Sequence, residues 1–132
     1  MPWQGNLMRT LFILFLLLPS TLLAEERALS SSEMRELLTG NTAIGHWIDH
    51  NYRQWFEASG TTIYAPEHGR SSRGRWRLND TTDEYESEWG QSNYWEGYKI
   101  LQKSGQFYWI SDGVAPQPFK VVEGQDLVWP AE

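Results

Sequence analysis

Hydrophobic residues are spread unevenly along the chain, and the first change in their pattern lies near the N-terminus. Leu11 to Leu18 form an unbroken run of eight apolar residues, preceded by Arg9 and followed, after Ala24, by an acidic pair. A charged residue, a short apolar core and a small residue before a polar stretch are typical of a secretory signal peptide. The run is far shorter than the ~20 residues that a membrane-spanning helix needs. We therefore predict a signal peptide over residues 1–24, cleaved near Ala24–Glu25.

This leader predicts a periplasmic or secreted protein with no transmembrane segment after signal cleavage. An uncleaved membrane anchor is the alternative. Either Met1 or Met8 could start the chain, and Met8 would place Arg9 directly after the start, as in a charged leader.

A short helix is predicted after the leader. Ser30 suits the N-cap, and Glu33 three residues later completes a capping box. Gly40 is a natural C-terminal end. Apolar residues at helical spacing form one stripe, namely Met34, Leu37 and Leu38. A helix of ~8 residues is marginal alone, so this stripe is expected to pack against the rest of the protein.

Beyond the helix the apolar period changes to that of strands. Short runs rich in β-branched and aromatic residues alternate with turn signals about every ten residues, which is typical of an antiparallel sheet or barrel. The turn signals are Ser59-Gly60, Ser104-Gly105, Asp112-Gly113 and Glu123-Gly124. Pro116 and Pro118 are expected to break the ladder before the eighth strand. The predicted strands are 42–48, 52–57, 61–65, 73–78, 84–89, 97–103, 106–111, 118–122 and 126–129.

These elements predict a mainly β fold. We expect a small antiparallel β-barrel, or a two-layer sandwich, of eight to nine short strands with one N-terminal helix. The barrel is favoured because closure removes exposed strand edges. Residues 25–132 are expected to form a single antiparallel β domain, since no linker or repeat interrupts them.

Composition adds a core and several exclusions. The chain of 132 residues holds eight tryptophans, and we expect most of them to be buried, because large rings can replace the disulfides of small exported domains. It has no cysteine, which excludes disulfides, thiolate zinc sites, iron–sulfur clusters, a cysteine nucleophile and a lipid anchor on cysteine. The formal net charge of −6 argues against nucleic acid as a partner. We expect no cofactor.

Several segments resemble a known group of proteins. The chain carries a Leu-x-Gly-Asn-Thr turn over residues 38–42 and a Gly-x-Trp strand segment over residues 74–76. In this it resembles short exported Gram-negative proteins grouped as domains of unknown function. The resemblance spans most of the chain after the leader and implies a periplasmic location. It implies no activity and no catalytic residues.

An aromatic-rich stretch is the first candidate site. Trp89, Tyr94 and Trp95 flank or lie within a Gly/Ser/Asn-rich segment. Aromatic rings on a polar loop suit stacking on a sugar, a peptide or an acyl chain, so these three residues are the predicted ligand-binding residues. The alternative is that the loop folds back and caps the barrel mouth with its own rings.

Histidines are the second candidate. His46 and His50 are four residues apart, and His68 could add a third metal ligand after folding. However, Asp49-His50-Asn51 reads as a turn, which places His46 on a strand and His50 beyond it. We therefore predict no metal site. No catalytic motif is present, so the sequence leaves enzymatic activity open but favours a protein without it.

Four arginines between Arg70 and Arg77 could bind an anion. The sequence offers another explanation, because Arg73, Arg75 and Arg77 share one strand face and a glutamate series alternates in the same way downstream. A hairpin centred between Asp80 and Thr81 would pair the two series. The predicted pairs are Arg77 with Glu84, Arg75 with Glu86, Arg73 with Glu88, and Trp76 with Tyr85.

Three functions remain open from the sequence. The favoured one is a binding or interaction module that uses an aromatic-rich mouth or loop, with a small molecule, a glycan or an envelope protein as partner. The second is a hydrolase of envelope polymers that uses carboxylates or the His46/His50 region. The third is a structural envelope protein without a ligand.

Overall fold

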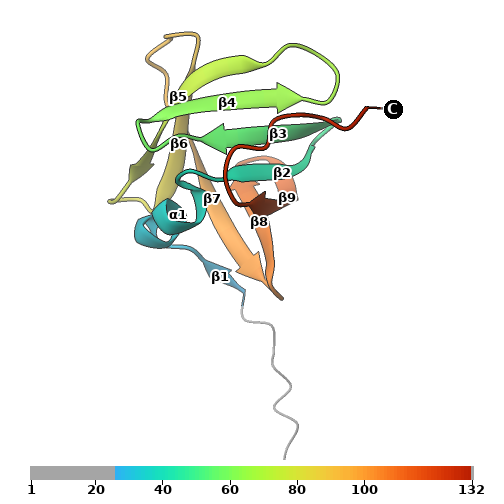
Figure 1. Cartoon of the computed structure of the whole chain (residues 1–132). Coiled ribbons are helices and arrows are strands. Elements are labelled where there is room, and N and C mark those ends of the chain that lie inside the picture. The colour runs from blue at the N-terminus through green and yellow to red at the C-terminus, as the bar shows by residue number, and fades with distance from the viewer. Residues whose placement is uncertain (1–25, 132) are drawn as a thin grey trace, which may run out of the picture.

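The computed structural model describes residues 26–131, which form a β-barrel with a short helix against it (Figure 1). The predicted signal peptide over residues 1–24, and the alternative of a membrane anchor, lie outside these residues. Within residues 26–131, no helix is long and apolar enough to cross a membrane.

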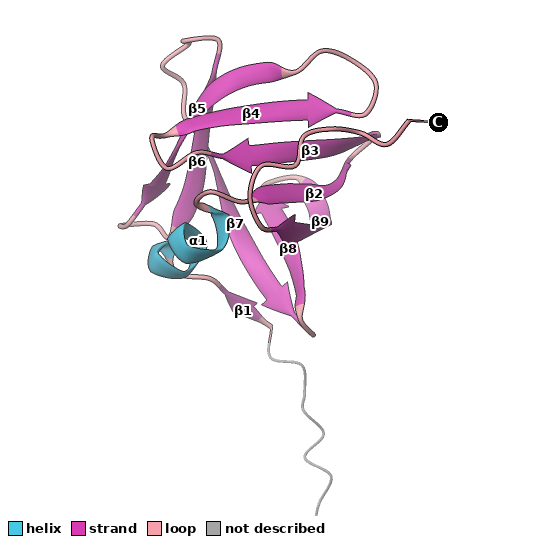
Figure 2. Cartoon of the chain, in the orientation of Figure 1, coloured by secondary structure: helices cyan, strands magenta, loops and turns pink. Residues whose placement is uncertain are grey.

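The described residues contain one helix and nine strands. Figure 2 distinguishes the two kinds of element by colour. The predicted mainly β fold with one N-terminal helix is confirmed. The elements are β1 (Arg27–Ala28), α1 (Ser31–Leu38), β2 (Thr42–Trp47), β3 (His50–Phe56), β4 (Thr61–Pro66), β5 (Ser72–Asn79), β6 (Glu84–Trp89), β7 (Glu96–Lys103), β8 (Gln106–Ser111) and β9 (Val114–Val122).

Strands β2 to β9 form a closed barrel, so the barrel prediction is confirmed over the sandwich. Each strand pairs in antiparallel fashion with the next along the chain, and β9 returns to pair with β2. Strand β6 pairs with β7 only from Tyr85↔Tyr98 to Ser87↔Glu96. The short β1, which the sequence did not predict, pairs with the other end of β7 at Leu101 and Gln102.

The ninth predicted strand, 126–129, is wrong. This tail is held on the outside of the barrel by side chains instead of a ladder. Arg53 forms an ion pair with the Asp126 carboxylate at 2.8 Å, and its guanidinium lies 4.8 Å from the centre of the Trp129 ring. Trp129 Nε1 also donates a hydrogen bond to the carbonyl oxygen of Ala65 at 3.1 Å. Trp129 therefore anchors the tail through side-chain contacts, not through strand pairing.

The predicted break at Pro116 and Pro118 is also wrong, because β9 begins at Val114 and runs through both prolines. Proline lacks a backbone N–H and is tolerated where a ladder is interrupted. The pairing of β9 with β2 ends at Phe119, one residue after Pro118. The pairing of β9 with β8 is irregular where Pro116 lies, opposite the segment between Trp109 and Ser111.

The β5–β6 hairpin adopts a register two residues away from the predicted one. Arg75 lies opposite Glu88 and Arg77 opposite Glu86, while Trp76 lies opposite Ser87. Because side chains alternate with a period of two, a shift of two residues leaves both charged series on the same outer face.

The position of the turn causes this shift. The sequence predicted a hairpin centred between Asp80 and Thr81, within a turn-like stretch over residues 79–83, whereas the loop spans residues 80–83 and the register is centred between Thr81 and Thr82. The Asn79 side-chain oxygen accepts hydrogen bonds from the backbone N–H groups of Thr81 and Thr82, at 3.0 and 3.2 Å. Asp83 adopts a positive φ of 52°. Asparagine side chains favour such turns by bonding the backbone two residues on.

Helix α1 seals one end of the barrel. Its predicted capping box is present, since Ser30 Oγ accepts from the Glu33 backbone N–H and the Glu33 carboxylate accepts from the Ser30 backbone N–H, each at 3.2 Å. Met34 and Leu38 point into the core and are fully buried. The backbone N–H of Ser31 donates to Asp83 Oδ1 at 2.8 Å, which ties the helix to the β5–β6 loop.

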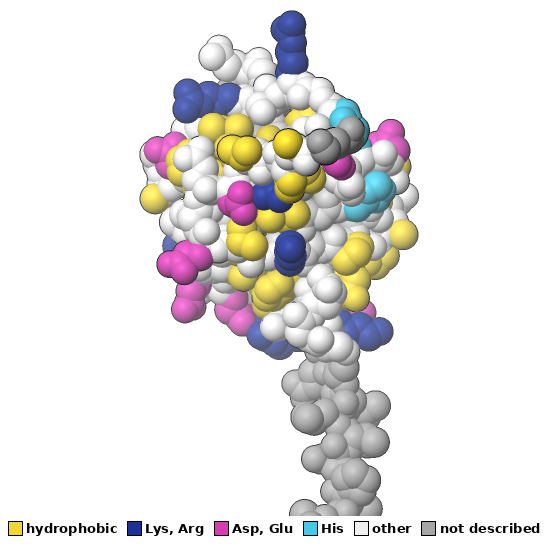
Figure 3. Space-filling view, turned by 45° about the vertical axis from the view of Figure 1, so that its right-hand side comes forward, with side chains coloured by type: hydrophobic (Ala, Val, Ile, Leu, Met, Phe, Trp, Pro, Cys, Tyr) yellow, Lys and Arg dark blue, Asp and Glu magenta, His cyan; other side chains and the backbone are white. Residues whose placement is uncertain are grey.

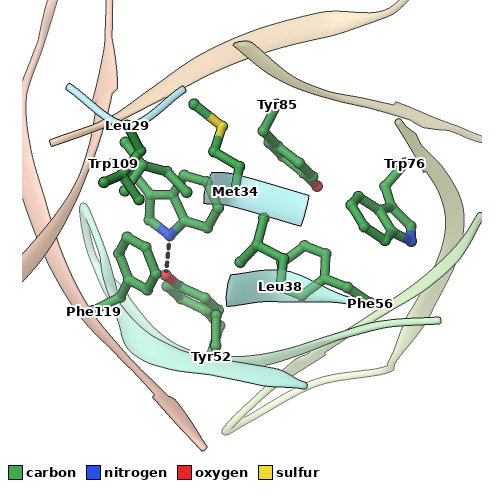
Figure 4. Packing of buried hydrophobic residues seen from close by; sticks show 11 residues of the cluster. Leu29, Met34, Leu38, Tyr52, Phe56, Trp76, Tyr85, Trp109 and Phe119 are labelled. Atoms are coloured by element: carbon green, nitrogen blue, oxygen red, sulfur yellow. Dashed lines mark hydrogen bonds between the residues drawn. The ribbon is translucent and has the colours of Figure 1, made fainter. Parts of the chain in front are cut away.

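The core is largely aromatic. Figure 4 shows the helix residues Met34 and Leu38 among rings that project from the strands. Phe56 packs edge to face against Trp76 and Tyr85, and Trp109 stacks on Phe119 with ring centres 4.4 Å apart. Aromatic pairs in these arrangements stabilise a fold by about 0.5–1.5 kcal/mol beyond the area they bury.

Candidate functional site

A cavity of about 270 Å³ lies at the end of the barrel away from α1. Helix α1 contacts the loop at one end of β5 and β6, whereas the cavity is reached by Ser72 and Trp89 at the opposite ends of the same strands. Its lining consists of Trp47, Tyr52, Gln54, Tyr64, Ser72, Tyr85, Ser87, Trp89, Tyr98 and Trp109.

The cavity walls are aromatic rings held against one another. Tyr52 and Tyr64 are stacked with ring centres 5.1 Å apart. Trp89 meets Tyr64 edge to face at 6.0 Å, and Trp47 meets Tyr98 edge to face at 5.7 Å. Because each ring is fixed by a neighbour, the cavity presents preformed flat surfaces.

A hydrogen-bond network lies among these rings. The Gln54 amide nitrogen donates to Thr62 Oγ1 at 3.0 Å and to the Tyr85 hydroxyl at 2.9 Å. Trp109 Nε1 donates to the Tyr52 hydroxyl at 2.8 Å, the bond drawn in Figure 4. Both tyrosine oxygens thus act as acceptors, which leaves each hydroxyl proton free for another partner.

The lining is polar in places but carries no formal charge. Its ten residues include no acidic or basic side chain among those described. Burial raises the pKa of Tyr85 to about 12 and holds the pKa values of Tyr52, Tyr64 and Tyr98 well above their ordinary value. All four tyrosines therefore remain neutral hydroxyl groups at physiological pH.

A chain of hydrogen bonds runs from the surface to the cavity. His50 Nδ1 lies 2.9 Å from Asp49 Oδ1, and His50 Nε2 lies 2.6 Å from the Tyr64 hydroxyl. A carboxylate only accepts hydrogen bonds, so Nδ1 carries the proton, and in the neutral ring Nε2 accepts the proton of Tyr64. The bond with His50 also holds the pKa of the Asp49 carboxyl below its usual value.

The three predicted ligand-binding residues are not brought together. Trp89 ends β6, lines the cavity and donates a hydrogen bond from Nε1 to Ser87 Oγ at 3.3 Å. Tyr94 is 72 % exposed on the β6–β7 loop. Trp95 lies on the outer wall under two arginines, with the guanidinium of Arg77 3.9 Å and that of Arg75 5.1 Å from its ring centre.

The arginines form part of the outer wall. Arg75 Nε donates to Glu88 Oε2 at 2.7 Å, and Arg77 Nε donates to Glu86 Oε1 at 2.7 Å. Glu88 is only 1 % exposed, so its carboxylate is buried where it pairs with Arg75. These contacts account for two of the four arginines that could have bound an anion.

The histidines do not converge on a metal site. Within residues 26–131, no group of three or more His, Cys, Asp or Glu side chains is placed to hold a metal ion. His50 begins β3 instead of lying in the predicted turn, which is formed by Ile48 and Asp49. His46 binds Asn51 Oδ1 at 2.8 Å. Figure 3 shows histidine side chains at the surface.

Most of the lining was missed by reasoning from sequence. Trp47, Tyr64 and Tyr98 lie far apart in the chain and meet only because β2, β4 and β7 face a common interior. The available signal was strand alternation: Tyr52 and Gln54 share a face in β3, as Tyr85, Ser87 and Trp89 do in β6. A small polar residue among large rings on an inward face could have pointed to a hollow.

The chain matches no protein-family model, no curated protein and no solved structure. The resemblance to exported proteins of unknown function therefore stays a prediction, and function is inferred from the cavity.

Proposed function

We propose that this protein is a binding module that holds one small, uncharged and largely aromatic ligand in the cavity of its barrel. The main support for this proposal is the lining of the cavity, because seven of its ten residues are aromatic. The interior of an eight-stranded barrel is either filled by its own side chains or accommodates one small ligand. Here α1 and the core rings fill the sealed end and leave the other end hollow.

The chemistry of the cavity favours a flat ligand. Ligand sites in proteins are mostly apolar with a few polar groups that fix orientation. Tyr52 and Tyr64 offer ring surfaces, and the hydroxyl groups of Ser72 and Ser87 offer hydrogen bonds at the edge. A charged ligand would lose its hydration without gaining a counter-charge, which is unfavourable.

A fluorescence titration tests this proposal. N-phenyl-1-naphthylamine is an uncharged dye whose emission rises in apolar surroundings, and we expect saturable binding of one dye per chain. Replacing Ser72 by Trp should fill the cavity and abolish the emission rise. The matched control is Arg73→Trp, which places the same ring one residue further along β5, on the outer face.

Two results would contradict the proposal. The first is a wild-type protein that leaves the dye emission unchanged, which would favour a structural protein without a ligand. The second is equal loss of binding in S72W and R73W while both variants keep the wild-type circular dichroism spectrum, because the dye would then bind elsewhere.

Export is the second part of the proposal. Its support is the leader over residues 1–24, with a charged residue, a short apolar run and a small residue before Glu25. A periplasmic or secreted location would expose the cavity to small molecules, to glycans or to other proteins of the cell envelope.

Hydrolysis is the alternative function, and the Asp49–His50–Tyr64 chain is the observation that favours it. Such a chain could move a proton between solvent and the cavity. Burial raises the pKa of Tyr64, however, which makes its oxygen a poor nucleophile. Turnover of envelope polymers that is lost in His50→Gln, while dye binding is kept, would support the hydrolase over the binding module.

A further inference from the structure

Gln54 brings an amide group into the cavity lining. It projects from β3 into the interior and is only 6 % exposed. A polar group in the lining of a mostly apolar site fixes the orientation of a ligand through a hydrogen bond. The part of the Gln54 amide that remains available to the cavity therefore indicates which group a ligand would supply.

The orientation of the Gln54 amide follows from its neighbours. Thr62 Oγ1 gives its single proton to the carbonyl oxygen of Trp55 at 2.9 Å. It can therefore only accept a hydrogen bond from Gln54, so the amide nitrogen must face Thr62. The second proton of the same nitrogen goes to the Tyr85 hydroxyl at 2.9 Å. The amide cannot be turned over without losing the bond with Thr62.

The carbonyl oxygen of the Gln54 amide remains available as a hydrogen-bond acceptor. Within residues 26–131, no donor forms a hydrogen bond with Gln54 Oε1. This oxygen is not sealed in the protein interior, and Gln54 is part of the cavity lining. The inner part of the cavity thus holds an acceptor in a setting made of Tyr52, Tyr85 and Trp109 rings.

We infer that the ligand of this cavity is a flat, uncharged aromatic molecule that donates one hydrogen bond, from a ring N–H or O–H at its inner edge, to Gln54 Oε1. This inference rests on the proposed binding function and adds the class of ligand. The tyrosine rings select a flat shape, the uncharged lining selects a neutral molecule, and Gln54 selects a donor. A site built around a buried polar group rejects an analogue that leaves this group unpaired.

Two bicyclic probes of nearly the same shape test the donor requirement. Indole carries a ring N–H, and benzofuran has an oxygen acceptor at the same place. Isothermal titration calorimetry should show that the wild-type protein binds indole about tenfold more tightly than benzofuran, the factor expected for one buried hydrogen bond.

Gln54→Met removes the acceptor and keeps the length of the side chain. We expect this variant to bind the two probes with affinities within about twofold of each other, through a loss of indole binding and not a gain of benzofuran binding. Gln125→Met is the matched control, because Gln125 lies exposed on the C-terminal tail, and it should keep the tenfold preference.

Each outcome separates the inference from the proposed function. Equal binding of indole and benzofuran by the wild-type protein would overturn the donor requirement and leave the binding module standing. Binding of neither probe, in a protein that also fails to bind the naphthylamine dye, would overturn both. A preference for indole that persists in a folded Q54M variant would assign the donor to another acceptor and overturn the role of Gln54. The wild-type comparison remains decisive if Q54M does not fold.

Discussion

Buried tyrosines connect the cavity to the stability of the fold. Tyr52 and Tyr85 lie 2 % and 3 % exposed, and burial favours the neutral form of a phenol over the charged one. In the unfolded chain the same hydroxyls ionise with a pKa of about 10. The folded protein therefore holds these protons more tightly than the unfolded chain does.

This difference predicts a loss of stability at high pH. The stabilisation is fully present below about pH 10, and it is lost as the pH rises toward the folded pKa of Tyr85, about 12. In that interval each such tyrosine lowers the free energy of unfolding by about 1.4 kcal/mol per pH unit. Urea unfolding at a series of pH values measures the slope. Tyr85→Phe should reduce it, whereas Tyr94→Phe, at an exposed position, should leave it unchanged; the reverse pattern would contradict this account.

For single residues, the sequence predicts which residue types form the site. It does not predict as well which way each side chain points. Trp89 and Trp95 belong to one aromatic-rich stretch, yet Trp89 lines the cavity and Trp95 packs on arginines outside the barrel. Trp89 continues the inward alternation of β6, whereas Trp95 follows a loop whose path a local pattern does not determine. Gln54 carried no signal as a single residue, because its role depends on Thr62 and Tyr85 across the sheet.

Secondary-structure elements that depend on residues close together in the sequence can be predicted from it. The helix start depends on Ser30 and Glu33, which are three residues apart, and the structure confirms both bonds of the capping box. The β5–β6 register depended on where the turn is centred, and the hydrogen bonds from Thr81 and Thr82 to the Asn79 side chain stabilise the observed turn. The tail failed as a strand because its contacts with Arg53 and Ala65 lie more than sixty residues away in sequence.

The capping box gives a prediction about the helix as an element. Ser30→Ala removes the acceptor of the Glu33 backbone N–H and should lower the free energy of unfolding by about 0.5–2 kcal/mol. The effect should reach the global stability because Met34 and Leu38 pack in the core and seal the barrel. Urea unfolding measures it. Ser32→Ala, on the exposed side of α1, is the control and should change stability by less than about 0.5 kcal/mol. An S30A midpoint equal to wild type would show that the cap does not stabilise the docked helix.

At the scale of the whole molecule, the two ends of the barrel are built differently. One end is closed by α1, whose first turn is bound to the β5–β6 loop, and the other is hollow and ringed by aromatic side chains. The tail binds the outer wall through Arg53 and Trp129. The chain has no cysteine and therefore no disulfide. Its distant segments are held together by noncovalent contacts, such as those of Arg53 with Asp126 and Trp129.

Strand β1 bears on where the predicted signal peptide would be cleaved. Arg27 at the start of β1 donates two hydrogen bonds of 2.7 Å to the Glu33 carboxylate, and it also contacts Gln102 on β7 at 3.2 Å. Cleavage after Ala24 keeps this residue, whereas cleavage after Arg27 would remove it and shorten β1. An intact β1 therefore requires a mature N-terminus at or before Arg27.

We accordingly expect N-terminal sequencing of the exported protein, recovered from the periplasm of a Gram-negative host, to begin at or within a few residues of Glu25. Leu14→Arg interrupts the apolar run of the leader and should leave the full-length mass in the cell, because a charge in this segment prevents its recognition. A conservative Leu14→Ile variant is the control and should be processed like wild type. Full-length protein in the membrane fraction would contradict the signal peptide and favour the membrane anchor. A start beyond Arg27 would instead show that β1 is dispensable for the barrel.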